Sequence, residues 1–429
     1  MSSILTNRPS SRRRLLENIF SLYMLQGLNY FIPMAVLPYL IRVLGVDVYG
    51  LVAFSQAFAQ YFVIFTDYGF NFSATRYIAK HRDSSRNIRE MFWQVYILKF
   101  VFLIVGIFIL GVLILVVPRL RHDYSYFLWA YLAVLGNVLF PQWYFQGVEK
   151  MKYISVCTGI AKVLSALALF VWVHRPEDGV LAVIFQSGGM LVAGMLGFVI
   201  ALREIGGPFV RPSRSSLHAT LGDGWHLFVS SAAISLYTNT NLVLVGLLAG
   251  NTQAGYFSVA EKIVRAMSGL IAPAMQAFFP HVNALLMQSR ERAFQMLARL
   301  LRGVAVFTFL ASAFLLLFAN PLAILLFGKG AAEGSIVVVR WIAFLPFLIG
   351  VSNVLGIQTM LPLGFDRSFS RILIISGLVN LTFGIPLIHF LGARGASISV
   401  LLTEAYVTLA MVFFLQRKNI HLFRLELAG

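Results

Sequence analysis

Eight charged residues lie at least three residues inside long apolar stretches of this 429-residue sequence. The basic ones are Lys99, Lys162, Lys262, Arg265 and Arg340, and the acidic ones are Asp67, Glu261 and Glu404. A charge inside a membrane costs about 3 kcal/mol on insertion scales, so such residues usually face a cavity or a partner. Because the basic residues outnumber the acidic ones, we expect a cavity that attracts anions, including phosphate groups.

The depth of each charge within its apolar stretch separates stronger candidates from weaker ones. Lys162 and Glu404 fall near the middle of their stretches, and we predict functional roles for both. Lys99 and Arg340 lie nearer a boundary, where a long side chain can extend to the membrane surface. Asp67 also lies close to the end of its stretch.

Three of the charges fall on one predicted helix. Glu261 and Arg265 are four residues apart, so the two side chains are placed to neutralise each other. Lys262 points about 100° away from Glu261 around such a helix and has no partner close in sequence. We therefore predict that Lys262 is a cation within a cavity.

Uncharged polar residues mark further helix faces. Gln56 and Gln60 share one face of a helix, and a later stretch carries a cluster: Ser235, Thr238, Asn239, Thr240 and Asn241. Such groups can bind sugar hydroxyls, but they also form hydrogen bonds between packed helices. The sequence leaves both roles open.

Twelve long apolar stretches must position these residues. They span 19–41, 49–70, 92–117, 124–148, 153–174, 178–201, 224–249, 254–280, 301–327, 335–362, 369–390 and 393–416. Each is about as long as the 20 or so residues that a helix needs to cross the hydrocarbon layer. Backbone polar groups cannot remain unpaired in lipid, so the stretches should be helices. The sequence therefore predicts an all-α polytopic membrane protein.

The basic residues are distributed unequally between the two sides of the predicted membrane. The side that holds the N-terminus carries 23 of the 34 Lys and Arg residues. The opposite loops carry six, which are Arg42, Arg119, Arg121, Arg175, Lys329 and Arg394. Basic loops stay in the cytoplasm, so we predict that both termini are cytoplasmic.

The chain divides into two groups of six predicted helices. Residues 203–216 read REIGGPFVRPSRSS, a composition typical of a flexible linker. We expect an N-terminal six-helix lobe at 1–201, a cytoplasmic linker at 202–217 and a C-terminal six-helix lobe at 218–429.

The two groups look like a repeat. Gly45 and Gly50 follow the first stretch at the same spacing as Gly250 and Gly255 after the seventh. The stretches that open at Gly179 and Gly395 also correspond. Because each half has an even number of helices, a pseudo-two-fold axis along the membrane normal should relate the lobes, a plan in which transporters bind substrate between the halves.

Several classes of protein are disfavoured. Most of the net charge of +17 comes from the Lys and Arg residues concentrated in the loops on one side of the predicted membrane. Because no soluble domain presents these charges, we expect no nucleic-acid binding. Cys157 is the single cysteine, and we find no Walker A loop and no paired metal ligands. We expect no metal, no cofactor and no enzymatic activity.

Three stretches resemble the O-antigen flippases, the Wzx-type polysaccharide transporters of the multidrug/oligosaccharidyl-lipid/polysaccharide exporter superfamily. They are Leu37-Pro-Tyr-Leu-Ile-Arg-Val-Leu-Gly45 with Thr66-Asp-Tyr-Gly-Phe70 and Ser73-Ala-Thr-Arg76, then Pro141-Gln-Trp-Tyr-Phe-Gln-Gly-Val-Glu-Lys-Met151, and Gly255-Tyr-Phe-Ser-Val-Ala-Glu-Lys-Ile-Val-Arg265 with Phe279-Pro280-His281. The resemblance extends over essentially the whole chain.

The resemblance implies a transporter with two lobes that open alternately to either side of a bacterial inner membrane. Its substrate would be undecaprenyl diphosphate carrying an oligosaccharide repeat unit, moved with H⁺ or Na⁺ as the coupling ion. We predict that Lys162, Lys262, Arg265, Arg340 and Lys99 bind the substrate and that Glu404, Glu261 or Asp67 binds the coupling ion. Membrane lipids and other polysaccharide-assembly membrane proteins are the expected partners.

Two alternatives stay open. A multidrug cation exporter of the same superfamily would need acidic residues to dominate the cavity. A membrane glycan polymerase would need a sizeable loop outside the membrane, whereas the loops opposite the N-terminus are only a few residues long. Both therefore fit the sequence less well than the flippase.

Overall fold

The computed structural model describes residues 11–328, 332–420 and 422, and within them every regular element is a helix. The N-terminal half contains α1 (Ser11–Asp67), α2 (Phe70–Lys80), α3 (Ser85–Val116), α4 (Pro118–His122), α5 (Tyr124–Ala130), α6 (Leu132–Leu139), α7 (Gln142–Gly147), α8 (Met151–Trp172), the 3₁₀ helix η1 (Pro176–Asp178) and α9 (Gly179–Ile205). The C-terminal half contains α10 (Arg214–Leu248), α11 (Asn251–Gly269), α12 (Ala272–Gln288), α13 (Arg290–Leu317), α14 (Ala319–Phe327), α15 (Ala332–Ile342), α16 (Leu345–Asn353), the π-helix η2 (Val354–Met360), α17 (Asp366–Leu391) and α18 (Ala393–Arg417).

The predicted membrane-spanning helices are present. Nine helices or runs of helices in the described residues are long and apolar enough to cross a membrane. One of them, Ile32–Lys80, includes parts of two predicted spans, which meet at Gly45, where the backbone leaves the helical conformation (φ 74°, ψ 164°). The remaining two predicted spans correspond to α10 and to α11 with α12. The prediction of an all-α polytopic membrane protein is confirmed.

Four of the predicted spans are interrupted. The stretch 301–327 is divided between α13 and α14, and the stretch 335–362 is divided between α15 and α16. The stretch 124–148 forms α5, α6 and α7, with breaks at Tyr131 and at Phe140-Pro141. The stretch 254–280 is divided between α11 and α12 just before Pro273. Proline has no backbone N–H to donate and displaces the preceding turn, so a long apolar stretch that contains it need not be one rod.

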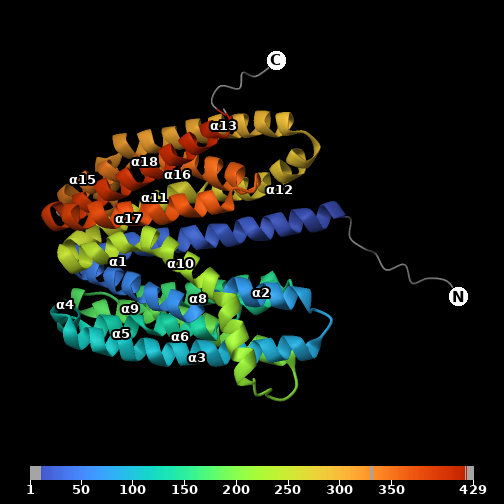
Figure 1. The fold of residues 1–429 in the computed structure, drawn as a ribbon. Coiled ribbons are helices and arrows are strands. Elements are labelled where there is room, and N and C mark those ends of the chain that lie inside the picture. The colour runs from blue at the N-terminus through green and yellow to red at the C-terminus, as the bar shows by residue number, and fades with distance from the viewer. Residues whose placement is uncertain (1–10, 329–331, 421, 423–429) are drawn as a thin grey trace.

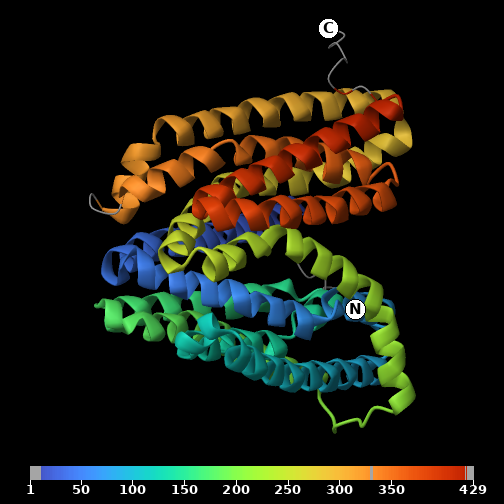
Figure 2. The same cartoon turned by 60° about the vertical axis from the view of Figure 1, so that its left-hand side comes forward.

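The helices form two layers, with α1 and α10 between them (Figure 1). Helices α3 to α9 lie on one side of α1, and α11 to α18 lie on the other (Figure 2). The non-helical segment between α9 and α10 covers 206–213, which is shorter than the linker predicted from composition. We call the end of the bundle with Gly45 and Gly250 the glycine end, and the opposite end the linker end.

Serine caps begin three helices at the linker end. The side chains of Ser84, Ser213 and Ser289 accept hydrogen bonds from backbone N–H groups of α3, α10 and α13. Each cap satisfies a donor that the first helical turn leaves free. The caps of α3 and α13 come from residues 205 apart, the same offset that relates Gly45 to Gly250.

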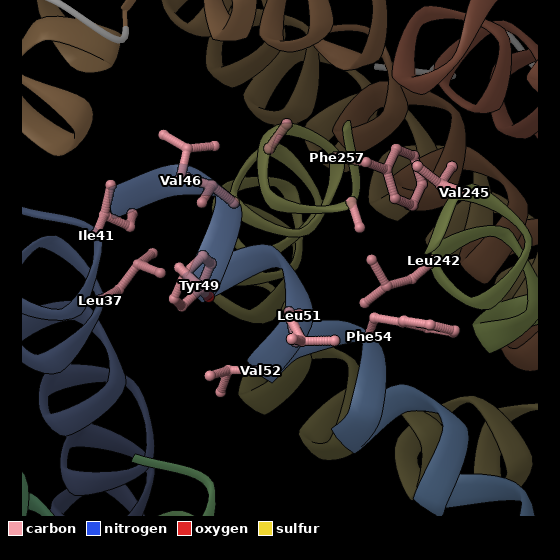
Figure 3. Packing of buried hydrophobic residues seen from close by; sticks show 14 of the residues in the cluster. Leu37, Ile41, Val46, Tyr49, Leu51, Val52, Phe54, Leu242, Val245 and Phe257 are labelled. Carbon is pink, nitrogen blue, oxygen red and sulfur yellow. The ribbon is translucent and has the colours of Figure 1, made fainter. Parts of the chain in front are cut away.

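The apolar core differs between the two ends. At the glycine end one cluster of buried residues includes side chains from both halves, and Figure 3 shows Phe54 of α1 beside Leu242 of α10, with Phe257 of α11 beside Val245 of α10. Toward the linker end, one cluster lies among α12, α13 and α18, and another lies among α2, α3 and α7. The halves therefore share a core at the glycine end. Toward the linker end the two clusters are separate, and α10 packs Leu217 and Leu221 against the one in the N-terminal half.

Candidate functional site

The two halves meet at the glycine end through reciprocal glycine contacts. Gly45 (φ 74°) and Gly250 (φ 92°) both adopt the left-handed region that favours glycine. Five residues later, a Cβ on Gly50 would collide with the carbonyl oxygen of Asn251, and a Cβ on Gly255 would collide with that of Val46. Each glycine thus contacts the residue equivalent to the one that its own counterpart contacts, which is the pattern that a two-fold axis produces. The segments that begin at Gly45 and Gly250 therefore meet on the pseudo-two-fold axis that relates the halves.

Polar contacts join the halves at the same end. Asp47 Oδ1 accepts a hydrogen bond from Thr252 Oγ1 at 2.7 Å, and these residues are also 205 apart. Arg119 donates to Asn251 Oδ1 at 2.6 Å, and Arg42 donates to the carbonyl oxygen of Leu325 at 2.5 Å. From the sequence, both arginines are predicted only as loop charges. Aligning the halves at this offset would have placed Asp47 opposite Thr252.

The strongest candidate site lies on one face of α11, which we call the α11 charged face: Glu261, Lys262 and Arg265. Arg265 donates to Glu261 Oε1 through Nη2 at 2.8 Å and through Nε at 3.3 Å. Its Nη2 also lies 3.4 Å from Asn239 Oδ1 of α10. The predicted neutralising pair is therefore present, and it leaves the Arg265 side chain 56% exposed.

Lys262 contacts the other half of the molecule. Its Nζ donates to Tyr49 Oη at 2.6 Å and lies 5.1 Å from the centre of the tyrosine ring. Tyr49 is on α1, which explains why no partner was visible close in sequence. The contact shows that the α11 charged face is turned toward the N-terminal half.

The depth of this face indicates what surrounds it. Arg265 is 14 residues from the first residue of α11, which is about 21 Å along the helix. In a hydrocarbon layer about 30 Å thick, that position is far from the glycine end. An exposed guanidinium at such a depth is far less costly beside water than in lipid, so we expect the Arg265 side chain to face water rather than lipid.

Lys99 and Asp67 form an ion pair within the N-terminal half. Their charged atoms are 3.2 Å apart, and the side chains are 1% and 19% exposed. Lys99 therefore does not extend to the membrane surface, which is one of the interpretations that its position near a boundary allows. In this conformation each residue is the partner of the other.

Lys162 and Arg340 lie away from the α11 charged face. Lys162 lines a cavity of about 310 Å³ whose walls come from α1, α8 and α9 of the N-terminal half. Gln186 lines the same cavity, and its Nε2 is buried and has no hydrogen-bond partner in the described part of the chain. Arg340 is exposed on α15, with Nη2 3.4 Å from Asn320 Oδ1. The structure thus separates these two cations from Lys262 and Arg265.

Glu404 lies on α18 beside a buried polar cluster of the C-terminal half. It is 9% exposed and follows Thr403, whose hydroxyl accepts a hydrogen bond from Asn380 Nδ2 at 3.2 Å. Ser399 accepts from the same amide nitrogen at 3.3 Å. The Oδ1 atoms of Asn380 and Asn241 are buried and have no hydrogen-bond partner among the described residues. The cluster thus presents two amide oxygens that can accept hydrogen bonds.

The sequence matches known polysaccharide proteins. The model of a family described as "Polysaccharide biosynthesis protein" matches residues 15–286. A protein of Escherichia coli (strain K12) named "Putative O-antigen transporter" is 34% identical, over 97% of this chain and 99% of its own length. A protein of Shigella dysenteriae with the same name is 30% identical, over 92% of this chain and 98% of its own length.

Solved structures share the fold. The inward closed conformation of the lipid II flippase MurJ superposes with a TM-score of 0.68 at 12% identity, covering 92% of this chain and 87% of that one. An inward-facing multidrug resistance MATE family transporter of the MOP superfamily gives 0.66 at 15% identity, covering 91% and 98%. These likenesses confirm the predicted two-lobe fold.

The relatives are named as transporters, which agrees with the expectation that the chain is not an enzyme. The family model covers more than half of the chain, and the Escherichia coli relative is similar along nearly all of it. The chain therefore belongs to the polysaccharide biosynthesis protein family, its two full-length relatives are named O-antigen transporters, and its apolar helices make it a multi-pass membrane protein.

Proposed function

We propose that this transporter is a flippase for undecaprenyl-diphosphate-linked oligosaccharide repeat units, which it moves from the inner to the outer leaflet of a bacterial inner membrane. The observation that carries the proposal is the exposed guanidinium of Arg265, deep within the bundle and beside Lys262. A diphosphate needs cations at the depth where it crosses the hydrocarbon layer.

The α11 charged face has the chemistry for such a head group. Guanidinium groups bind phosphate oxygens through paired hydrogen bonds, and ammonium groups act as point charges. Glu261 orients Arg265 and leaves much of its side chain exposed. Gln60, exposed on α1, and Asn239 on α10 would bind sugar hydroxyls. The polyprenyl chain would remain in lipid.

The other predicted cations would act at other stages. Lys162 would offer a second anion site in the N-terminal half, in the cavity that it shares with the Gln186 amide. Lys99 would become available only if its ion pair with Asp67 opened. Arg340, nearer the glycine end, would meet the head group as it leaves.

Alternating access would use the difference between the two ends. Contacts between the halves close the glycine end, while the cores are separate toward the linker end. The excess of basic residues in the loops at the linker end favours a cytoplasmic position for that end, so this conformation would receive substrate from the inside. Release would require the Asp47–Thr252 and glycine contacts to separate.

Ion coupling would act through a carboxylate that changes its ligands between conformations. Glu404 is the favoured group because it lies beside a buried cluster with two amide oxygens that have no hydrogen-bond partner among the described residues. These oxygens could accept a hydrogen bond from a protonated water or coordinate Na⁺. Glu261 and Asp67 are the alternatives, and each is held by a cation in this conformation.

The test is translocation of a polyprenyl-diphosphate oligosaccharide by protein reconstituted in vesicles. The Lys262→Ala/Arg265→Ala variant should translocate the glycolipid at least about tenfold more slowly, since charge-assisted contacts contribute about 1.5–3 kcal/mol each before solvent screening. Arg367→Ala/Arg371→Ala removes an exposed pair on α17 and should leave the rate unchanged. Unchanged transport by the Lys262/Arg265 variant would remove both residues from the mechanism.

The same vesicles distinguish the rival function. A multidrug cation exporter would move a lipophilic cation, but the α11 charged face carries two basic residues and one acidic residue. We therefore expect the protein to transport no such cation. Efflux of the cation, without movement of the glycolipid, would favour the rival.

A further inference from the structure

A groove lies between α12 and α13 on the C-terminal half, apart from the α11 charged face. It has a volume of about 920 Å³, at the upper end of the range for ligand sites. Its walls are mainly apolar and include Met275 and Phe278 of α12 and Leu300 and Phe307 of α13. Arg292 and Arg299 also line it.

The two arginines are placed to hold an anion. They are seven residues apart, so they share one face of α13, and both are exposed. Among the residues that the structure describes, neither guanidinium has an ion-pair or hydrogen-bond partner. Surface arginines are often merely solvated, but these two border an apolar groove that runs away from them along α13.

The dimensions of the groove match one leaflet of a membrane. Arg292 lies two residues inside the linker end of α13, and Phe307 is 15 residues further along. That separation is about 22 Å, and one leaflet with its head-group region, half of a bilayer of about 40–45 Å, is about 20–22 Å thick. A phosphate bound near Arg292 and Arg299 would lie at head-group depth, and an acyl chain would fit in the apolar remainder.

The equivalent surface of the N-terminal half is covered by protein. Arg292 and Arg299 correspond to Asn87 and Gln94 of α3 at the 205-residue offset. Gln94 Oε1 accepts a hydrogen bond from Thr220 of α10 at 2.7 Å, because α10 packs across α2 and α3 there. In the C-terminal half no described segment crosses the groove, and two of its three polar lining residues, Arg292 and Arg299, are charged, whereas the third, Gln295, is neutral.

We propose that the α12–α13 groove binds an anionic glycerophospholipid of the leaflet at the linker end. Arg292 and Arg299 bind the phosphate, and one acyl chain occupies the groove as far as Phe307. Basic pockets between membrane helices at the cytoplasmic surface commonly bind anionic head groups. The lipid takes the place that α10 occupies in the other half, and the site is separate from the transport path.

Two variants test the two parts of this site. Arg292→Gln/Arg299→Gln removes the charges, and its matched control is Arg367→Gln/Arg371→Gln, another exposed pair at the linker end. Gly303→Leu fills the groove: Gly303 lines it, and a Cβ there would meet nothing within 4 Å. Gly111→Leu, which also extends into open space on α3, is the control for this change.

The measurement is binding of phosphatidylglycerol, with phosphatidylcholine as the zwitterionic comparison, to the purified full-length protein by native mass spectrometry. We expect a phosphatidylglycerol-selective site whose affinity falls by about tenfold or more in the arginine variant and also falls in Gly303→Leu, with both controls unchanged. Equal loss in the arginine control would overturn the proposal, as would normal binding by Gly303→Leu.

Two further outcomes would also contradict the proposal. If polyprenyl diphosphate displaced phosphatidylglycerol from the groove at equal concentration, the groove would belong to the substrate. A chain ending at Leu422 tests the protein's own C-terminus as the occupant. Binding that appeared only after this truncation would assign the groove to residues 423–429.

Discussion

The second part of α1, from Val46 to Asp67, and helix α11 begin alike and then diverge. Both follow a glycine of positive φ, and both place a second glycine on the axis between the halves. At the 205-residue offset, Gln56 and Gln60 of α1 correspond to Glu261 and Arg265 of α11, and Ala57 corresponds to Lys262. The two helices share the glycines at which the halves touch. The three charges of the α11 charged face have no charged counterpart in α1.

This comparison separates two physical demands on a repeat. Residues at the axis contact their own equivalents, so both copies need the small side chain that the close approach requires. Under the proposed function, the residues of α11 that face the other half contact a substrate that has no two-fold symmetry. One half can therefore supply the cations while the other supplies neutral amides. Arg299 and Gln94 repeat the same division at the linker end.

The axis contacts should give the largest effect. Gly50→Leu and Gly255→Leu each place a side chain against backbone atoms of the other half. Overpacking costs about 1–3 kcal/mol, so the closed glycine end should become about 5-fold to 150-fold less populated. The measurement is cross-linking between cysteines introduced at Asp47 and Thr252, with Cys157 replaced by serine. Unequal effects of the two substitutions, or an equal effect of Gly111→Leu, would contradict the two-fold comparison.

Substitutions at the α11 charged face should give the second-largest effect. Arg265→Gln gives α11 the residue found at the same place in α1, and glycolipid translocation should fall about tenfold. Arg265→Lys keeps the charge but loses the paired geometry, so its loss should be smaller. Gln60→Ala, at the equivalent position of α1, should change the rate less than about twofold. Equal losses in Arg265→Gln and Gln60→Ala would show that the halves contribute alike.

The contact between Lys262 and Tyr49 should have a smaller effect. Tyr49→Phe removes the oxygen that accepts from Lys262 and retains the ring. Because Lys262 is exposed, solvent screening reduces the contribution to about 1 kcal/mol, which is about fivefold in the closed fraction of the cross-linking assay. Tyr39→Phe removes a hydroxyl that donates within the N-terminal half, to the carbonyl oxygen of Val173, and should leave that fraction unchanged.

The smallest effect should come from the hydrogen bond between Asp47 and Thr252. Asp47→Ala and Thr252→Val each remove the same bond, whose net contribution is about 1 kcal/mol. The double variant should therefore be no less stable than the more affected single variant. The measurement is thermal unfolding of the protein in detergent micelles. Fully additive losses would mean that the two residues do not interact in solution.

The fold was predictable because a membrane limits the alternatives. Apolar stretches of sufficient length must be helices in lipid, and Gly45 and Gly250 at equal spacing revealed the repeat. The ion pair of Glu261 with Arg265 was visible because four residues is one helical turn. The breaks at Tyr131 and between α11 and α12 were not predicted, because hydropathy does not report the local path of the backbone.

The site was only partly predictable. Glu261, Lys262 and Arg265 come together because they share a helix, but the partners of Lys262 and Lys99 come from residues distant in sequence or from another helix. Depth along a helix placed Lys162 and Glu404 correctly near mid-span, yet depth does not say which neighbours surround a side chain. Lys162 lies in its own cavity in the N-terminal half.

The sequence by itself determined the helical class, the two related halves and the excess of cations inside the membrane, since these follow from length, spacing and charge. Only the tertiary structure decided that Tyr49 meets Lys262, that Asp67 neutralises Lys99 and that the halves touch at Gly50 and Gly255. The physical reason is that a helix determines neighbours three or four residues apart, whereas contacts between helices depend on how whole rods pack.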